Sequence, residues 1–88
     1  MYEIIYSPDC LDYLDKLDMD ILLRITKKIE KLRDEKQRRH LHHGIPIFVE
    51  DVNQYRICYE LFEDSKIIRI DFIGKHKDYE RWYKQSWS

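Results

Sequence analysis

The hydrophobic pattern of the first 35 residues changes from an alternating to a helical period, and the helical part is interrupted once, which predicts one strand followed by two helices. Alternating residues at the start predict a strand over residues 1–6. Ser7-Pro8-Asp9 then combines a helix cap, a proline suited to the first turn and an acidic residue, so a helix is expected over residues 8–17. An apolar stripe at helical spacing predicts a second helix over residues 19–35: Ile21, Leu22, Ile25, Ile29 and Leu32. Only a short cap separates the helices, so we expect an antiparallel helix hairpin that covers a sheet.

The second half of the chain predicts three further strands. Residues 36–44 lose the helical period and predict a basic loop. Apolar or alternating runs predict strands over residues 45–49, 55–61 and 66–73, with Pro46 near the start of the first or on a sheet edge. The last two of these runs are joined by an acidic turn. After them, a short tail or one helical turn is expected over residues 77–84.

The last two strands are expected to pair in a register that gathers their apolar residues on one face. With Glu63-Asp64 at the tip, the apolar pairs are Tyr59 with Ile68, Ile57 with Ile70 and Tyr55 with Phe72. The same register sets Arg56 opposite Asp71 as an ion pair across the strands. The polar face is then expected to be partly open and to bear Arg56, Cys58, Glu60, Arg69 and Asp71.

These elements predict a single α+β domain over residues 1–88. Its N-terminal strand, helix hairpin and later antiparallel strands form a four-stranded curled sheet with the helices on one face. Apolar residues make up 43% of the chain and aromatic residues 14%, enough for one small core and too many for a disordered chain. The two isolated cysteines, Cys10 and Cys58, predict buried thiols rather than a disulfide framework or a cysteine zinc site. The sequence shows no 18-residue apolar run and no signal-peptide pattern, so we expect a cytoplasmic protein with no membrane partner.

Charge is distributed unevenly along the chain although the formal net charge is only −1. Residues 1–20 hold six acidic residues against Lys16, whereas residues 24–43 hold eight Lys and Arg and three His against three acidic residues. A basic run of this kind is compatible with an anionic partner and equally with a solvated face.

The order of these patterns resembles the RelE/ParE toxin superfamily over nearly the whole chain. Its specific parts are the strand Tyr55-Arg56-Ile57-Cys58-Tyr59 and the ending Gly74-Lys75-His76-Lys77-Asp78-Tyr79, which is most like the histidine-bearing RelE-like toxins. The loop Leu41-His42-His43-Gly44 lies between them and the helices. The resemblance implies a RelE-like fold and a toxin of a type II toxin–antitoxin pair, with a cognate antitoxin as its partner.

The resemblance also implies an activity. RelE-like members inhibit translation as endoribonucleases that cut messenger RNA on the ribosome, using the RNA 2′-hydroxyl as nucleophile and neither metal nor cofactor. This chemistry requires a base, an acid and cations on the developing phosphate charge. The alternative is a non-catalytic member of the fold, either a ParE-like gyrase inhibitor or an inactive antitoxin-binding relative.

Carried over to this sequence, the family's catalytic positions match Arg56, which contacts the scissile phosphate, His76 as general acid or base, and Tyr79. Histidine suits that role because it exchanges protons near neutral pH. The resemblance and the basic loop give the RNA-binding set Lys75, Lys77, Trp82, Arg39, His42 and His43. No metal is expected, because the histidines at positions 40, 42 and 43 lack a zinc-site spacing.

The sequence also departs from the family pattern, and bland alternatives stay open. Ile47 and Val49 stand where RelE carries lysines, and the chain is not strongly basic, which favours the non-catalytic alternative. Without a phosphate role, Arg56 is a structural ion-pair partner and His76 an exposed histidine. Tyr79 and Trp82 then pack a C-terminal turn against the sheet.

Overall fold

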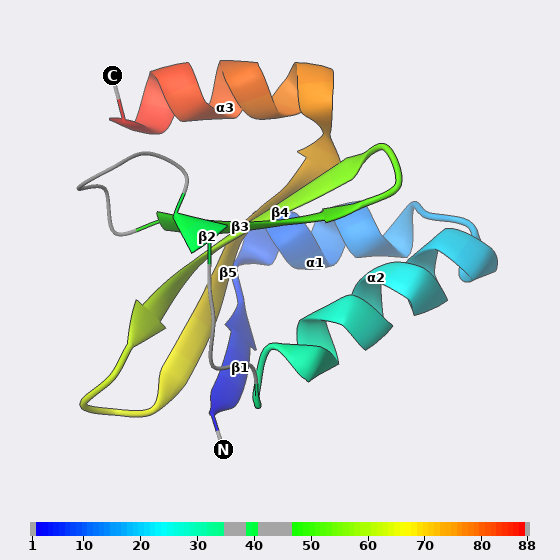
Figure 1. Ribbon diagram of the computed structural model, residues 1–88. Helices are drawn as coiled ribbons and strands as arrows, with labels where there is room; N and C mark the ends of the chain where they lie inside the picture. The colour runs from blue at the N-terminus through cyan, green and yellow to red at the C-terminus, as the bar shows by residue number, and fades with distance from the viewer. Residues whose placement is uncertain (1, 35–38, 41–46, 88) are drawn as a thin grey trace.

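A five-stranded sheet separates two helices on one face from a third helix on the other (Figure 1). The computed structural model describes residues 2–34, 39–40 and 47–87. The strand order is β1-β5-β4-β3-β2, in which β1 runs parallel to β5 and the other neighbours are antiparallel. The elements are β1 (Glu3–Tyr6), α1 (Pro8–Asp15), α2 (Met19–Lys31), β2 (Arg39–His40), β3 (Ile47–Val52), β4 (Tyr55–Phe62), β5 (Ile67–Lys75) and α3 (His76–Trp87). The predicted α+β class and all four predicted strands are confirmed. The two-residue β2 lies where a loop was expected.

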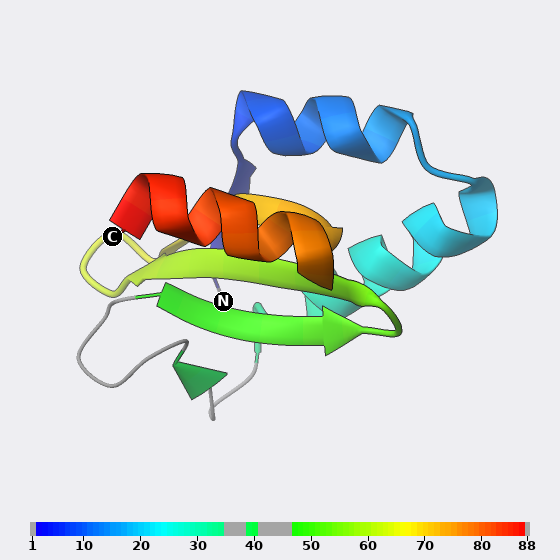
Figure 2. The same ribbon diagram turned by 90° about the horizontal axis from the view of Figure 1, so that it is seen from above.

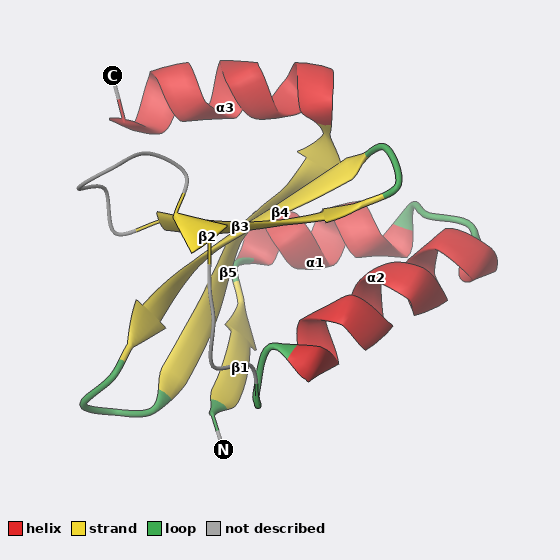
Figure 3. Ribbon diagram, in the orientation of Figure 1, coloured by secondary structure: helices red, strands yellow, loops and turns green. Residues whose placement is uncertain are grey.

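The predicted helix hairpin is present, with both helices ending a few residues early. The Ser7 hydroxyl accepts a hydrogen bond from the backbone N–H of Cys10 at 3.3 Å, and Pro8 occupies the first turn of α1. Asp18 precedes α2 in an extended conformation without a side-chain capping bond. Figure 3 shows the two helices joined by a short loop. Their apolar stripes face the same side of the sheet.

The main core lies between this hairpin and the sheet. Ile25, Ile29 and Leu32 of the second helical stripe are fully buried, as are Ile57, Tyr59, Ile68 and Ile70 of the two central strands. Phe48 stacks on Tyr59 with ring centroids 5.6 Å apart. Since each fully buried aliphatic side chain contributes about 1.5–3 kcal/mol, this interface is the main source of stability.

The predicted register of β4 and β5 is wrong by two residues next to the turn, which is longer than expected, and by three residues beyond a bulge. The turn spans residues 63–66, and Lys66 adopts the left-handed conformation with φ 58°. The strand pairing then skips Asp71: Tyr59 faces Ile70, whereas Cys58 faces Phe72. A bulge shifts the alternation by one residue. Consequently Ile73 points into the main core, and Phe72 points to the opposite face.

A second, smaller core fills the face that was expected to stay open. Ile47, Val49 and Cys58 are buried there, and Phe72, Tyr79 and Trp82 pack against them. The predicted tail or single turn is wrong, since α3 has 12 residues and lies over this face (Figure 2). Tyr79 and Trp82, three residues apart on the helix, both reach the sheet because side chains at this spacing share one helix face. The polar face is therefore open only around the margins of α3.

Candidate functional site

Three of the predicted site residues meet at the corner where β5 passes into α3. Arg56 of β4 donates a hydrogen bond from Nε to Oδ1 of Asp51 on β3 at 3.0 Å. His76, the first residue of α3, places Nε2 3.5 Å from the same oxygen. The guanidinium carbon of Arg56 lies 4.7 Å from the centre of the Tyr79 ring. Arg56 and His76 thus approach one carboxylate, and the Tyr79 ring lies against Arg56.

Local backbone features explain why these side chains converge. Asn53 has φ 54° in the tight turn between β3 and β4, a conformation that asparagine tolerates well. That turn pairs Asp51 with Arg56 across the two strands. On the other side of β4, Arg56 lies opposite Gly74. A Cβ atom at Gly74 would lie 2.6 Å from Cζ of Phe72, so glycine leaves room for the ring on which α3 rests.

The surroundings of Arg56 keep its side chain positively charged and partly exposed to solvent. The hydrogen bond that Arg56 donates to Asp51 raises the pKa of Arg56 above its ordinary value. Burial, the largest cause, raises the pKa of Tyr79, although the neighbouring Arg56 opposes the shift. The Arg56 side chain is 23% exposed and that of His76 is 49% exposed. An anionic ligand can therefore reach a permanent cation, an exposed imidazole and a neutral phenol.

The remaining predicted residues are placed less uniformly. Lys75 and Lys77 flank His76 and are both exposed. Trp82 stacks on Phe72 with centroids 5.1 Å apart, so its ring packs in the second core. Arg39 lies in β2 opposite Val49, and its side chain lies outside the described part of the structure. His42 and His43 also lie outside the described residues.

Sequence reasoning missed Asp51 and assigned Arg56 the wrong partner. Asp51 was assigned to a turn, and Arg56 was expected to pair with Asp71. Instead, the Asp71 carboxylate accepts a hydrogen bond from Arg69 at 3.0 Å, and Arg69 also binds Glu60 at 2.6 Å. The longer turn and the bulge together place Gly74, not Asp71, opposite Arg56. The five-residue separation of Asp51 and Arg56 around a turn was the signal for their pairing.

The Glu60–Arg69–Asp71 cluster is a second group of charges on the same face. Burial, followed by the neighbouring Glu60, raises the pKa of Asp71 from its ordinary 3.8 to about 7. The Oδ2 atom of Asp71 is buried without a hydrogen-bond partner in the described part of the chain. This carboxyl is consequently poised to hold a proton near neutral pH.

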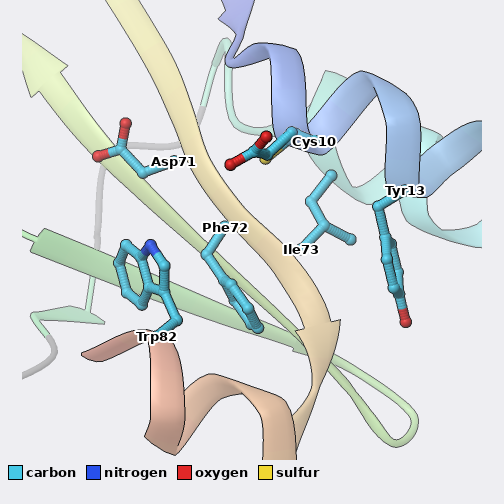
Figure 4. A pocket seen from close by; sticks show the side chains of 7 residues that line it. Cys10, Tyr13, Asp71, Phe72, Ile73 and Trp82 are labelled. Atoms are coloured by element: carbon cyan, nitrogen blue, oxygen red, sulfur yellow. The ribbon is translucent and has the colours of Figure 1, made fainter. Parts of the chain in front are cut away.

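A cavity of about 250 Å³ lies beside this cluster, between α1, β5 and α3. Figure 4 shows Asp71, Phe72 and Ile73 between Trp82 on one side and Cys10 and Tyr13 on the other. Asp9 completes the lining. Arg56 and His76 do not line this cavity, so it is separate from the corner described above.

Two structural findings limit what the described residues can form. Among residues 2–34, 39–40 and 47–87, no group of three or more His, Cys, Asp or Glu side chains has an arrangement suited to a metal ion. No helix in these ranges is long and apolar enough to cross a membrane.

Comparison with solved structures shows which fold this is. The structure matches the isolated E. coli RelE toxin with a TM-score of 0.74 and 14% identity, over 97% of this chain and 98% of that one. It matches the E. coli RelBE toxin–antitoxin complex with a TM-score of 0.74 and 16% identity, over 85% and 96%. The RelBE2 toxin–antitoxin complex of Mycobacterium tuberculosis gives a TM-score of 0.73 and 18% identity, over 85% and 91%.

The protein has the RelE-like toxin fold. No protein-family model matches the sequence, and no curated protein matches it. The fold likeness therefore rests on three-dimensional arrangement, and the predicted resemblance is confirmed at the level of the fold.

Proposed function

We propose that this protein is the toxin of a type II toxin–antitoxin pair and cuts messenger RNA at the corner formed by Arg56, His76 and Tyr79. The observation that carries the proposal is the approach of Arg56 and His76 to one oxygen of Asp51. A phosphate that displaces this carboxylate meets a guanidinium and an imidazole together, on a RelE-like fold.

In the proposed reaction, the 2′-hydroxyl of a ribose attacks the adjacent phosphorus, and the bond to the 5′-oxygen of the next nucleotide breaks. The products are a 2′,3′-cyclic phosphate and a free 5′-hydroxyl. Arg56 stabilises the negative charge that builds on the phosphate oxygens. His76 exchanges a proton with the attacking or leaving oxygen, and Tyr79 holds the guanidinium plane and lends its hydroxyl to proton transfer. No step requires a metal or a cofactor.

The exposed lysines around His76 extend the proposed contact with RNA. Lys75 and Lys77 supply charge for the neighbouring phosphates. Arg39, His42 and His43 remain proposed RNA contacts. Trp82 supports the site by packing α3 against Phe72. Its ring would have to leave this contact in order to stack on an RNA base.

The proposed partners are a cognate antitoxin and the translating ribosome. Two of the similar structures are toxin–antitoxin complexes, which supports an antitoxin for this chain. Messenger RNA in the ribosome is the substrate that the resemblance implies, and a cytoplasmic location accords with that target.

A second candidate function is a non-catalytic toxin or antitoxin-binding module of the same fold. Strand β3 contains no basic residue, and Ile47 and Val49 are buried, so this strand offers no cation to a phosphate. The near-neutral net charge points in the same direction. On this proposal, the Arg56–Asp51 pair has a structural task alone.

Growth arrest on induced expression separates the two candidates. We expect the native chain to arrest growth and to generate cellular RNA fragments with 5′-hydroxyl ends. His76→Ala and Arg56→Ala should each relieve arrest, whereas Lys16→Ala, on the exposed end of α1, should not. Arrest that persists in both site variants would refute the proposed site, and arrest without RNA fragments would favour the non-catalytic function.

A further inference from the structure

A groove lined by cations lies beside the candidate site. Its volume is about 380 Å³, and its walls are one face of α2 and the end of β3 with the following turn. The lining residues are Arg24, Lys27, Lys28, Lys31, Asp51, Val52 and Asn53. Asp51 also receives the Arg56 hydrogen bond, so the groove reaches the residue around which the site is built.

The four cations form one row because of their spacing on α2. Positions 24, 27, 28 and 31 share one face of a helix, and the row is about 10 Å long at 1.5 Å per residue. The apolar stripe that holds Ile25 and Ile29 in the core fixes the direction of this basic face. The four basic side chains are therefore carried by a helix that packs on the core, and they line the groove.

Most of the row is available to a ligand. Lys28 pairs with Glu50 at 3.4 Å and is the partly neutralised member. No described residue forms an ion pair with Arg24, Lys27 or Lys31, and all three are exposed. Among the described lining residues, Asp51 alone carries a carboxylate, and Arg56 pairs with it. A net positive groove thus exists on a chain whose total charge is −1.

We propose that this groove binds phosphodiesters of the RNA strand next to the one held by Arg56 and His76. The inference rests on the proposed function and adds the path of the substrate to it. Rows of Lys and Arg are suited to a nucleic-acid backbone, which they bind without reading sequence. Among the described lining residues, Val52 alone has an apolar side chain, whereas four carry a positive charge.

Continuity with the candidate site favours RNA over another polyanion. Asp51 lines the groove and also accepts the hydrogen bond from Arg56, so the groove and the candidate site meet at this residue. The groove also compensates for the missing lysines at Ile47 and Val49, because it places cations beside the proposed scissile phosphate from a different element. Substrate charge is then recognised by α2 rather than by β3.

The test is direct RNA binding by the full-length His76→Ala chain, which removes cleavage from the readout. The probe is a fluorescein-labelled single-stranded RNA, titrated at several salt concentrations by fluorescence anisotropy. Lys27→Gln with Lys31→Gln is compared with Lys16→Gln and Lys66→Gln, a pair of exposed lysines that removes the same charge away from the groove. Thermal melting by circular dichroism verifies that each variant is folded.

The variant with Lys27→Gln and Lys31→Gln should bind RNA more weakly. Its plot of log association constant against log salt concentration should also be less steep by about 1.4, at about 0.7 for each lost contact with a single-strand phosphate. Raising salt from about 50 to about 200 mM should therefore weaken the parent about sevenfold more than it weakens the variant. Lys27→Arg with Lys31→Arg should retain the parental affinity and slope. An equal effect of the control pair, an unchanged slope, or a parent that fails to bind RNA at low salt overturns the proposal.

Polyglutamate serves as a competitor of different chemistry. Displacement of the RNA by polyglutamate at equal charge would assign the groove to acidic proteins and overturn the proposal. The test also separates the inference from the proposed function. Growth arrest that depends on His76 together with unchanged RNA binding by the groove variant refutes the groove alone. Lost RNA binding together with arrest that ignores His76 and Arg56 refutes the nuclease site alone.

Discussion

Arg56 and His76 approach the same atom, Oδ1 of Asp51, from two different elements of the fold. The distances are 3.0 Å from Nε of Arg56 and 3.5 Å from Nε2 of His76. Gly74 lies opposite Arg56 and is followed two residues later by His76, so the β5–α3 junction delivers the imidazole to the guanidinium. A phosphate ligand at this corner must compete with the Asp51 carboxylate. Arg56→Lys and Asp51→Asn each change one partner of this contact.

Arg56→Lys should impair RNA cleavage although it preserves the charge. Lysine cannot reproduce the planar fork that binds Asp51 through Nε and rests on the Tyr79 ring. We expect the cleavage rate to fall about a hundredfold. The loss of folding stability should stay within about 1 kcal/mol, since the pair is partly exposed.

The measurement for Arg56→Lys is the rate of messenger RNA cleavage in a translating extract. Arg81→Lys, an exposed arginine on α3, is the matched control and should cleave at the native rate. Full activity of Arg56→Lys would contradict a role for the guanidinium in binding phosphate.

Asp51→Asn should tighten RNA binding. Asparagine still accepts the hydrogen bond from Nε of Arg56, but it removes the negative charge that opposes a phosphate at this corner. In the His76→Ala background, affinity should rise on the order of threefold to tenfold, or about 1 kcal/mol. Fluorescence anisotropy measures it, and Asp64→Asn in the exposed β4–β5 turn controls for total charge. Weaker binding would show that Asp51 is needed to hold Arg56 in place.

The fold could be predicted from the sequence as far as hydrophobic periodicity determines it. The stripe through Ile25 and Ile29 and the alternation through Ile57 and Tyr59 describe the main core correctly. The bulge at Asp71 could not be predicted in this way. A skipped residue does not change the number of apolar residues in the strand, but each side chain after it points to the opposite face of the sheet. The composition of one sequence does not reveal such a bulge.

The C-terminal helix was missed because its sequence is dominated by polar residues. Tyr79 and Trp82 were its only clear signal, at a spacing that also suits a single turn. One of their partners, Phe72, faces α3 only because the bulge at Asp71 reverses the side-chain alternation of β5. The length of α3 and the register of β5 are thus linked, and an error in one led to the error in the other.

The site could be predicted in part. Its cation and imidazole, Arg56 and His76, were identified from the family resemblance, and the structure brings them together. Asp51 was missed because its contact depends on the exact turn at Asn53. The cationic groove needed α2 and β3 to be adjacent, which no local pattern specifies.

Gly74→Ala should destabilise the second core. The added Cβ would lie 2.6 Å from Cζ of Phe72, and movement of that ring disturbs its stacking on Trp82. We expect a loss of about 1–3 kcal/mol in the free energy of unfolding, as for other overpacked sites. Urea denaturation measures it. Ser65→Ala in the exposed turn should stay within about 0.5 kcal/mol of the native value. An unchanged Gly74→Ala would mean that the ring relaxes at no cost.

Asp71→Asn should remove a pH dependence of stability. Burial and Glu60 raise the pKa of Asp71 from 3.8 to about 7, so between these values the folded chain holds a proton that the unfolded chain releases. Stability from this group is therefore complete below about pH 4 and is lost as the pH rises through about 7. Asparagine mimics the protonated form at every pH.

The free energy of unfolding of the native chain should therefore fall more steeply from pH 4 to pH 8 than that of Asp71→Asn. At pH 8 the variant should be more stable than the native chain by about 1–3 kcal/mol. Arg69 keeps its bond to Glu60 in the variant, which limits the loss from the missing ion pair. Urea denaturation across this pH range gives the comparison, with the exposed Asp64→Asn expected to follow the native curve. Parallel curves for Asp71→Asn and the native chain would show that Asp71 is ionised in the folded protein throughout, despite its burial beside Glu60.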